Sequence, residues 1–436
     1  MRLNAASSPP LGLVAPFLLA APLGLLAAGI LLGTTENSSL AGINVPKNVA
    51  ATHAAVIGGL TTAIMGAVYQ LGPAVLGGRL VSHRLARMQF AVHAVSVPGF
   101  VWALLEWNYG LMSAAAVGVL TSFVMFLINA VSAVGVRRPN SVTRAYLSAS
   151  LLLLVVTAAF GVTWVGALQH LWFPVTMGRL SGHAHLGLLG WLGLTVMGVS
   201  YQLVPMFNVV QKRQPRFAWA ALGLTGTAAV AGGLLLMTDP GREVRLVVVV
   251  AMGLGPALWG IDMLRLLLAR SRRNMDVQGR ATYVSLGFLA AAILLGMVVA
   301  VGGPLRDGDH AGRWQLAYGI CGIGGWAGLT LVGNSYKLLP FLVWYHRYRF
   351  LAGSRAVPMI TDIYSDRAAT AVMSGYALGL AVMAIGAGSA ELLVLRTGAW
   401  MLALSAAAHF VTLGHILFVP HAATARPARF VRGASP

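Results

Sequence analysis

Two histidines stand at matching places in this sequence, and their imidazole rings have the chemistry of metal ligands. His53 and His185 each precede a long apolar run that contains several glycines and ends on a tyrosine and a proline. A neutral imidazole is the commonest protein ligand of heme iron, and two of them on opposite faces of a porphyrin make a six-coordinate centre suited to electron transfer. The pair therefore indicates heme ligation. The alternative is that each ring only makes a hydrogen bond to a carbonyl group or to water.

A third histidine extends this argument. His183 lies two residues before His185, and residues two apart on an α-helix point about 200° away from each other. One helix can therefore serve two separate sites. Two interpretations of His183 stay open at this stage: a ligand of a second heme, or a polar contact to Arg179 or to the preceding loop.

The elements that position these histidines belong to an internal repeat. Three segments align without gaps, beginning at His53, His185 and Ile320, so the offsets are 132 residues (from 53 to 185) and 135 residues (from 185 to 320). Small residues at fixed spacing let membrane helices approach closely, which is the ordinary reason for such a pattern. The matched columns are Gly58, Gly190 and Gly325; Gly66, Gly198 and Gly333; Tyr69, Tyr201 and Tyr336; Leu71, Leu203 and Leu338; and Pro73, Pro205 and Pro340.

The composition places this repeat in a membrane. Of the 436 residues, 58% are hydrophobic and 9% are charged, and apolar runs of about 20 residues recur, which is the length that crosses a bilayer. We expect one all-α transmembrane domain over residues 1–436, with about twelve spans in three pseudo-symmetric four-helix repeats near 11–135, 145–269 and 281–418. The expected spans are 11–33, 48–76, 85–107, 110–135, 145–169, 181–208, 217–237, 246–269, 281–303, 314–343, 367–388 and 392–418.

The charge pattern predicts an orientation. The formal net charge is +19, but the basic residues lie in alternate loops and form no nucleic-acid surface. One such loop follows the sixth span and holds Lys212, Arg213 and Arg216. By the positive-inside rule these loops and both termini are cytoplasmic, so His53 and His185 lie near the outer surface at equal depth.

One part of the chain is similar to a known family. The stretch from Ser181 to Pro205, with His183-Ala-His185 near its start, resembles the tenth helix of subunit I of the heme–copper oxidases, in particular the cbb-type oxidases and nitric oxide reductases. The resemblance implies a b-type heme protein that handles electrons or a diatomic gas, dioxygen or nitric oxide. It also implies that His185 and His53 share a low-spin heme, and that His183 binds a second, high-spin heme.

The chain departs from the family pattern in its copper ligands. The family holds copper with a histidine on helix six and an adjacent His-His pair on helix seven, and no His-His pair occurs in this sequence. The His-x-His motif also lies on the sixth span here, and on the tenth in the family. We therefore expect far less than one copper per chain, and a divergent oxidoreductase, if the chain is an enzyme, that lacks the usual copper ligands.

Two rival functions stay open. One is an NnrS-like heme and copper protein of nitric oxide metabolism, and the other is a transporter without heme, since transporters also contain repeats and glycine-interrupted helices. The family resemblance further implies a bacterial inner membrane and an electron-donor partner such as a cytochrome c-type subunit. Heme propionates at the outer surface would be neutralised by Arg179, Arg313 or Arg396.

Other polar residues within the spans have weaker interpretations. His93 and His409 could bracket a second heme or a metal, although ordinary interhelical hydrogen bonding is the stronger expectation. Lys337 stands where the other repeats have glutamine, and it either takes part in a proton path or extends to the interface. Asp262 and Arg265 are one helical turn apart and are expected to pair.

Overall fold

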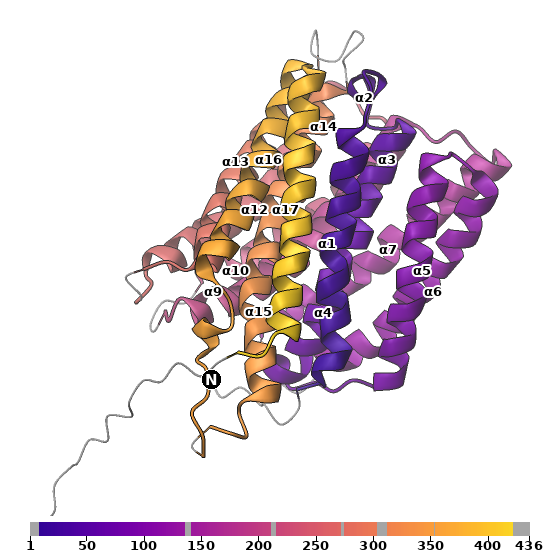
Figure 1. The fold of residues 1–436 in the computed structure, drawn as a ribbon. Helices are drawn as coiled ribbons and strands as arrows, with labels where there is room; N and C mark the ends of the chain where they lie inside the picture. The colour runs from indigo at the N-terminus through magenta and orange to yellow at the C-terminus, as the bar shows by residue number, and fades with distance from the viewer. Residues whose placement is uncertain are drawn as a thin grey trace, which may run out of the picture.

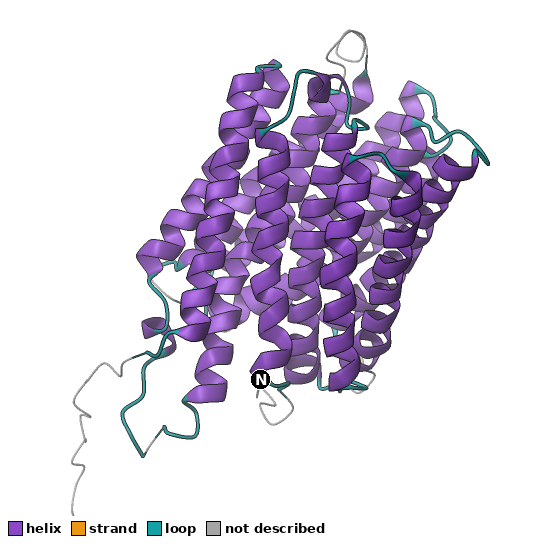
Figure 2. Ribbon diagram, turned by 45° about the vertical axis from the view of Figure 1, so that its right-hand side comes forward, coloured by secondary structure: helices purple, strands orange, loops and turns teal. Residues whose placement is uncertain are grey.

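The chain folds into a bundle of long helices. The structure is a computed structural model, and it describes residues 8–135, 141–210, 215–271, 274–302, 312–352 and 354–421. Within these ranges the elements are helices joined by loops, with no strand (Figures 1 and 2). Twelve of the helical segments are long and apolar enough to cross a membrane, which confirms the expected fold class.

The spans follow one another in chain order, and four of the described spans contain π-helical segments. The first four spans are α1 (Leu11–Gly33); α3 (Pro46–His53), η2 (Ala54–Thr61), α4 (Thr62–Leu71) and η3 (Gly72–Leu76) joined end to end; α5 (His83–Leu105); and α6 (Tyr109–Val134). The next four are α7 (Val142–His170); α8 (Met177–His185), η4 (Leu186–Gly193) and α9 (Leu194–Phe207); α10 (Ala218–Thr227), η5 (Ala228–Gly232) and α11 (Gly233–Leu236); and α12 (Arg242–Leu268). The last four are α13 (Val277–Val301); α14 (Arg313–Gly319), η7 (Ile320–Gly328) and α15 (Leu329–Arg347); α16 (Asp366–Ser389); and α17 (Leu392–Phe418). Two short helices, α2 (Ser38–Ala41) and η8 (Ile360–Asp362), lie in loops.

The expected boundaries agree with these helices to within a few residues. The sixth span begins at Met177, four residues before the expected start at 181. Thr176 explains the difference, because its hydroxyl accepts a hydrogen bond from the backbone N–H of Arg179 at 3.3 Å and so caps the helix ahead of the apolar run. Hydropathy alone does not detect polar first turns of this kind.

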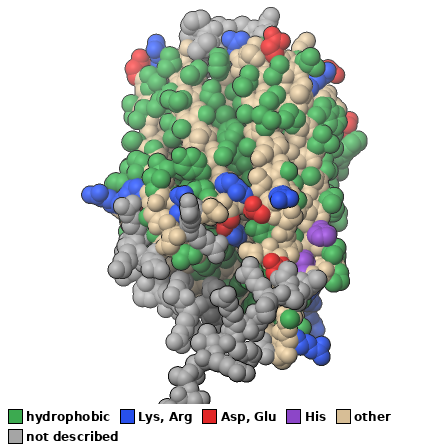
Figure 3. All heavy atoms as spheres, turned by 60° about the vertical axis from the view of Figure 1, so that its left-hand side comes forward, with side chains coloured by type: hydrophobic (Ala, Val, Ile, Leu, Met, Phe, Trp, Pro, Cys, Tyr) green, Lys and Arg blue, Asp and Glu red, His purple; other side chains and the backbone are tan. Residues whose placement is uncertain are grey.

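The outer face of the bundle is apolar, as a membrane requires. Large hydrophobic side chains stand exposed along the spans, for example Val95 at 77%, Leu294 at 68% and Leu404 at 70% of their full accessible area. Figure 3 shows a broad band of such side chains with charged groups gathered above and below it. The protein is therefore an integral membrane protein, since a surface of this kind is stable only in contact with lipid.

The matched glycines lie where helices approach closely. In each expected repeat the second glycine of the motif faces the first span of the same repeat, and a Cβ added there would fall within 3 Å of a neighbouring Cβ. The contacts are Gly66 with Phe17 (2.8 Å), Gly198 with Tyr146 (2.3 Å) and Gly333 with Ala281 (2.5 Å). The same packing thus recurs three times, which supports the threefold organisation inferred from the sequence.

The three motif-bearing spans also meet in the middle of the bundle. A small cavity of about 60 Å³ is bordered by side chains from all three, and these side chains occupy matched columns of the alignment. They are Ala67, Val199 and Asn334, and Leu71, Leu203 and Leu338. The second, sixth and tenth spans therefore form the inner ring of the bundle, and the other spans surround them.

The first and last described helices place both ends of the described chain on one side. α1 begins and α17 ends at the same end of the bundle (Figure 1). The charges of the loops predict which side of the membrane holds the two ends. Two of the basic residues used for that prediction, Lys212 and Arg213, lie outside the described residues. The cytoplasmic placement of the termini stays a prediction.

Candidate functional site

The two matched histidines occupy the same place in their helices. His53 is the last residue of α3 and His185 is the last residue of α8, and each is followed directly by a π-helical segment of eight residues. A third π segment, η7, begins at Ile320, the matched position of the third repeat. π-helical turns in membrane and soluble helices are frequent at functional sites because they change the direction in which side chains leave the helix.

Backbone carbonyls fix the orientation of both imidazole rings. Nδ1 of His53 lies 2.8 Å from the carbonyl oxygen of Val49, and Nδ1 of His185 lies 2.8 Å from that of Ser181. A carbonyl oxygen can only accept, so Nδ1 carries the proton in each ring and Nε2 carries the lone pair. Metal-binding histidines commonly have this arrangement, in which Nδ1 is held by a hydrogen bond and the lone pair of Nε2 is directed toward the metal.

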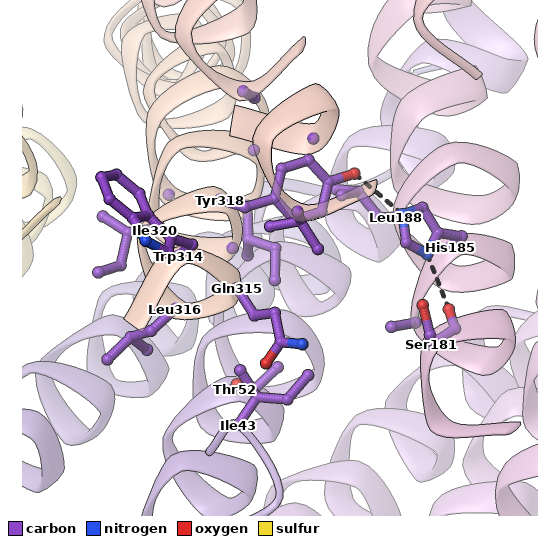
Figure 4. Close-up of a pocket in the computed structure, with 18 of the residues that line it drawn as sticks. Ile43, Thr52, Ser181, His185, Leu188, Trp314, Gln315, Leu316, Tyr318 and Ile320 are labelled. Carbon is purple, nitrogen blue, oxygen red and sulfur yellow. Dashed lines mark hydrogen bonds between the residues drawn. The ribbon is translucent and has the colours of Figure 1, made fainter. Parts of the chain in front are cut away.

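His185 presents its Nε2 to a tyrosine from the neighbouring repeat. The hydroxyl of Tyr318, on α14, donates to His185 Nε2 at 3.0 Å, and the two rings are nearly parallel, with centroids 5.7 Å apart and planes 25° apart (Figure 4). The nitrogen that would bind iron thus already faces a polar group of the site. Tyr318 would have to move from this nitrogen before coordination.

A large cavity lies beside His185. Its volume is about 360 Å³, within the range of roughly 300–1,000 Å³ that ligand pockets occupy, and its walls are mostly aliphatic and aromatic. The polar groups that line it include Thr52, His185 and Tyr318, and near the start of α12 it is bordered by Arg245. An apolar slot with an imidazole on its wall and an arginine at one end is chemically suited to a porphyrin with its propionates.

The arginine at this cavity is not one that we expected. Arg245 lines the cavity, and its guanidinium donates to the carbonyl of Pro240 at 2.8 Å. The expected arginines make other contacts: Arg179 binds the Pro174 carbonyl, Arg396 binds the Thr35 carbonyl, and Arg313 lies over the ring of Trp314. The propionate assignment from sequence stays a prediction, because loop charge alone does not tell which arginine folds onto the cavity.

His183 faces a different part of the bundle from His185. The ring of His183 lies against α7, where a Cβ added at Gly161 would lie 3.3 Å from Cε1. The imidazole also interacts with the backbone of Thr157 on the same helix. Its Nδ1 is buried and makes no hydrogen bond. His185, by contrast, contacts Tyr318.

His93 and His409 have both ring nitrogens engaged in polar contacts. His93 lies 2.9 Å from the Thr62 hydroxyl and 3.0 Å from the Ser122 hydroxyl. His409 lies 2.9 Å from the hydroxyl of Tyr336, with a second contact at 3.3 Å to Ser335. These are interhelical hydrogen bonds, and they leave neither ring with a nitrogen turned toward the other.

Two basic residues of the spans, Lys337 and Arg265, each form an ion pair with an aspartate. Lys337 lies 2.5 Å from Asp276, and both side chains are largely buried. Arg265 lies 3.2 Å from the buried Asp262, as expected from their spacing. Lys337 therefore neither extends freely to the interface nor stands alone in the membrane. Among the residues that the structure describes, no three His, Cys, Asp or Glu side chains gather closely enough to hold a metal ion on their own.

Comparison with known proteins agrees with this architecture. No family model matches the chain, and no curated protein matches it. A chain in a cryo-EM structure of a heme–copper terminal oxidase dimer superposes on it with a TM-score of 0.67. The two share 12% sequence identity, and the match covers 94% of this chain and 85% of that chain.

The chain is a twelve-span, all-helical membrane protein with its motif-bearing spans at the centre. Its fold is that of the heme–copper terminal oxidases, shared over nearly the whole chain. At this level of identity the likeness shows the fold, and the chemistry of the site has to be argued from the residues of this chain.

Proposed function

We propose that this protein is a membrane b-type heme protein that handles electrons or a diatomic gas, dioxygen or nitric oxide. The observation that carries the proposal is the environment of His185. Its Nδ1 is anchored on the Ser181 carbonyl, its Nε2 accepts from Tyr318, and the residue lines an apolar cavity of about 360 Å³. The same anchoring recurs at His53, one repeat earlier in the chain.

The residues of the chain have separate tasks in this proposal. Bound heme would supply one-electron redox chemistry and a site for a gas. His53, His183 and His185 would bind the iron, and Arg245 would neutralise propionate charge at the outer end of the cavity. The aliphatic walls exclude water, which strengthens each electrostatic contact inside. An electron donor, such as a cytochrome c-type subunit, would approach from the side that these groups occupy.

A visible spectrum tests the proposal directly. We expect the protein, purified from a heme-replete host, to show the reduced-minus-oxidised bands of b-type heme, and we expect His53→Ala and His185→Ala each to remove part of them. The matched control is His83→Ala, since His83 is an exposed residue at the start of α5. A wild-type protein without heme bands would refute the proposal and would favour the transporter.

The proposal also makes a prediction about copper. With no His-His pair in the sequence, we expect far less than one copper per chain, because a three-imidazole site cannot be assembled from the outer-half histidines that heme binding leaves over. Elemental analysis of the purified protein measures this. Stoichiometric copper that survives dialysis against a chelator would instead support the NnrS-like alternative.

A further inference from the structure

One buried hydrogen bond joins the two spans that carry the matched histidines. The indole Nε1 of Trp191, on the sixth span, donates to the hydroxyl of Thr61, on the second span, at 2.9 Å. We infer that these two side chains are positioning residues, and that their bond sets the relative depth and rotation of His53 and His185. This inference rests on the proposed function, because the orientation of the two imidazoles matters to heme only if they bind it.

Both partners of the bond lie in the π segments that follow the histidines. Thr61 is the last residue of η2, which begins directly after His53. Trp191 lies within η4, which begins directly after His185. A π segment changes the direction in which side chains leave a helix. A contact that holds the segment therefore also restricts the direction of the histidine at its start.

The bond lies in the closed interior of the bundle. Thr61 is 1% exposed and Trp191 is 2% exposed, and the indole ring also packs edge-on against Phe126, with centroids 6.2 Å apart. An indole N–H can only donate, and leaving it unpaired in such surroundings costs free energy. Turning either helix by the angle between neighbouring residues would separate the two groups. The bond therefore favours one relative arrangement of the two spans.

The matched positions of the third repeat lack this bond. Trp326 corresponds to Trp191, since 326 minus 191 is 135, and Gly193 corresponds to Thr61, since 193 minus 61 is 132. Trp326 and Gly193 are again neighbours, because a Cβ added at Gly193 would lie 3.1 Å from the Trp326 ring. Gly193 has no hydroxyl, and Nε1 of Trp326 is buried without a hydrogen bond to any described residue.

This difference follows the distribution of the histidines. The first and second repeats each have a histidine before the π segment, and their junction has the bond. The third repeat has Ile320 at the matched position, and its tryptophan has no partner in the second repeat. Helix packing alone does not explain why the hydroxyl stands only between the two spans that carry matched histidines.

Thr61→Val tests the inference, because a methyl group replaces the hydroxyl and removes the acceptor. The g values of a low-spin heme depend on the orientation of its axial imidazoles, which neighbouring groups hold in place. We expect Thr61→Val to shift the largest g value in electron paramagnetic resonance and to lower heme retention on gel filtration several-fold. Thr61→Ser keeps the acceptor and should restore both properties.

Thr195→Val is the matched control. Thr195 lies in α9 of the sixth span, is 2% exposed, and has a hydroxyl without a hydrogen bond to any described residue. The same substitution there breaks no bond, so the g values and heme retention should stay as in the wild type.

Trp191→Phe removes the donor from the other side of the bond. It should shift the largest g value as Thr61→Val does, and the double variant should show no further shift, because both substitutions remove the same bond. If Thr61→Val does not elute as wild type in detergent, Trp191→Phe provides the same test.

The possible results separate this inference from the proposed function. A lower unfolding midpoint in Thr61→Val, with the g values of the wild type, would show that the bond only stabilises the bundle, and would overturn the inference while heme binding stands. Equal shifts in Thr61→Val and Thr195→Val would overturn it as well, since the second variant loses no bond. Absence of heme in the wild type would refute the proposed function, and the positioning of heme ligands with it.

Discussion

Hydrogen bonds to backbone carbonyls are what distinguish the candidate ligands from the other histidines of the spans. His53 and His185 each use Nδ1 on a carbonyl four residues earlier, and the one further hydrogen bond that either ring makes to a described residue is the one that His185 Nε2 accepts from Tyr318. In contrast, both nitrogens of His93 are engaged with hydroxyl groups. The contrast follows from depth, because a histidine deep among packed helices must satisfy both nitrogens from neighbouring side chains.

Arg245 provides a test at the residue scale. We expect Arg245→Gln to lower heme retention several-fold on gel filtration, because a charge-assisted hydrogen bond to a propionate is replaced by a weaker neutral one. The measurement is the ratio of heme to protein absorbance after the column. Arg242→Gln is the matched control, since Arg242 is exposed in the same helix. Equal loss in both variants would show that Arg245 acts only through the net charge of the loop.

Residue types allowed the histidines to be predicted but not their partners. Tyr318 matches His183 in the repeat alignment, yet a phenol is not an expected ligand of b-type heme, so its role was not inferred. The partner of His53 was assigned by equal depth to His185, and that pairing stays a prediction. Which residue faces which is decided by the rotation of each helix about its axis, and a shift of two residues reverses the direction of a side chain.

Interior glycines set the spacing between the helices of each repeat. Gly198 lies against Tyr146, and its carbonyl accepts a hydrogen bond from the Thr143 hydroxyl at 2.9 Å, so side chains of α7 pack directly on the backbone of α9. This contact holds the sixth span, and with it both of its histidines, at a fixed distance from α7. The repeat positions of such glycines were visible in the sequence because helix spacing and residue size are directly linked.

Gly198→Ala should therefore be destabilising. The added Cβ would lie 2.3 Å from Tyr146 Cβ, so the helices must separate, at a cost of roughly 1–3 kcal/mol for an overpacked interior. Gly223→Ala is the control, because nothing lies within 4 Å of a Cβ at that position in α10. Thermal unfolding in detergent, followed by tryptophan fluorescence, should show a lower midpoint for the first variant only. Equal midpoints would mean that α7 and α9 adjust without cost.

The ion pair between α15 and the start of α13 is expected to stabilise the packing of these two helices. Lys337 and Asp276 have side chains only 12% and 16% exposed, and Asp276 also caps α13 through the N–H of Gly279. Lys337→Gln should lower stability by about 1–3 kcal/mol, less than the loss for a fully buried pair, because the remaining carboxylate keeps its cap.

A double variant provides the control for this pair. Asp276→Asn keeps a capping side chain and removes the charge, so Asp276→Asn combined with Lys337→Gln should recover most of the stability that Lys337→Gln loses. The unfolding midpoints of the two single variants and the double variant measure the coupling. Additive losses would show that the ion pair contributes nothing beyond its separate members.

At the scale of the whole molecule, hydropathy was enough to predict the twelve spans. A bilayer imposes one length on every crossing helix, so the apolar runs alone located them within a few residues. The π segments were not predicted, because they depend on how the inner spans pack together and not on their apolar character. The cavity beside His185 was also beyond the sequence, since it is bordered by side chains from spans far apart in the chain.

Orientation in the membrane is the last property that the sequence predicts for the whole molecule. The alternate basic loops predict that the loop after α15 is cytoplasmic and that the end of α16 is external. Ser354 is exposed in the first of these places and Ser389 in the second. The native Cys321 is buried, so single cysteines introduced at the two serines can be labelled selectively.

A membrane-impermeant maleimide applied to intact cells should therefore label Ser389→Cys and leave Ser354→Cys unlabelled until the membrane is permeabilised. The wild type serves as the control for reaction at Cys321. The expected result places His53 and His185, at the end of the bundle shared with Ser389, on the external side, where an electron donor outside the cell membrane can reach the hemes. The opposite labelling pattern would invert the molecule, and the donor would then have to approach from the cytoplasm.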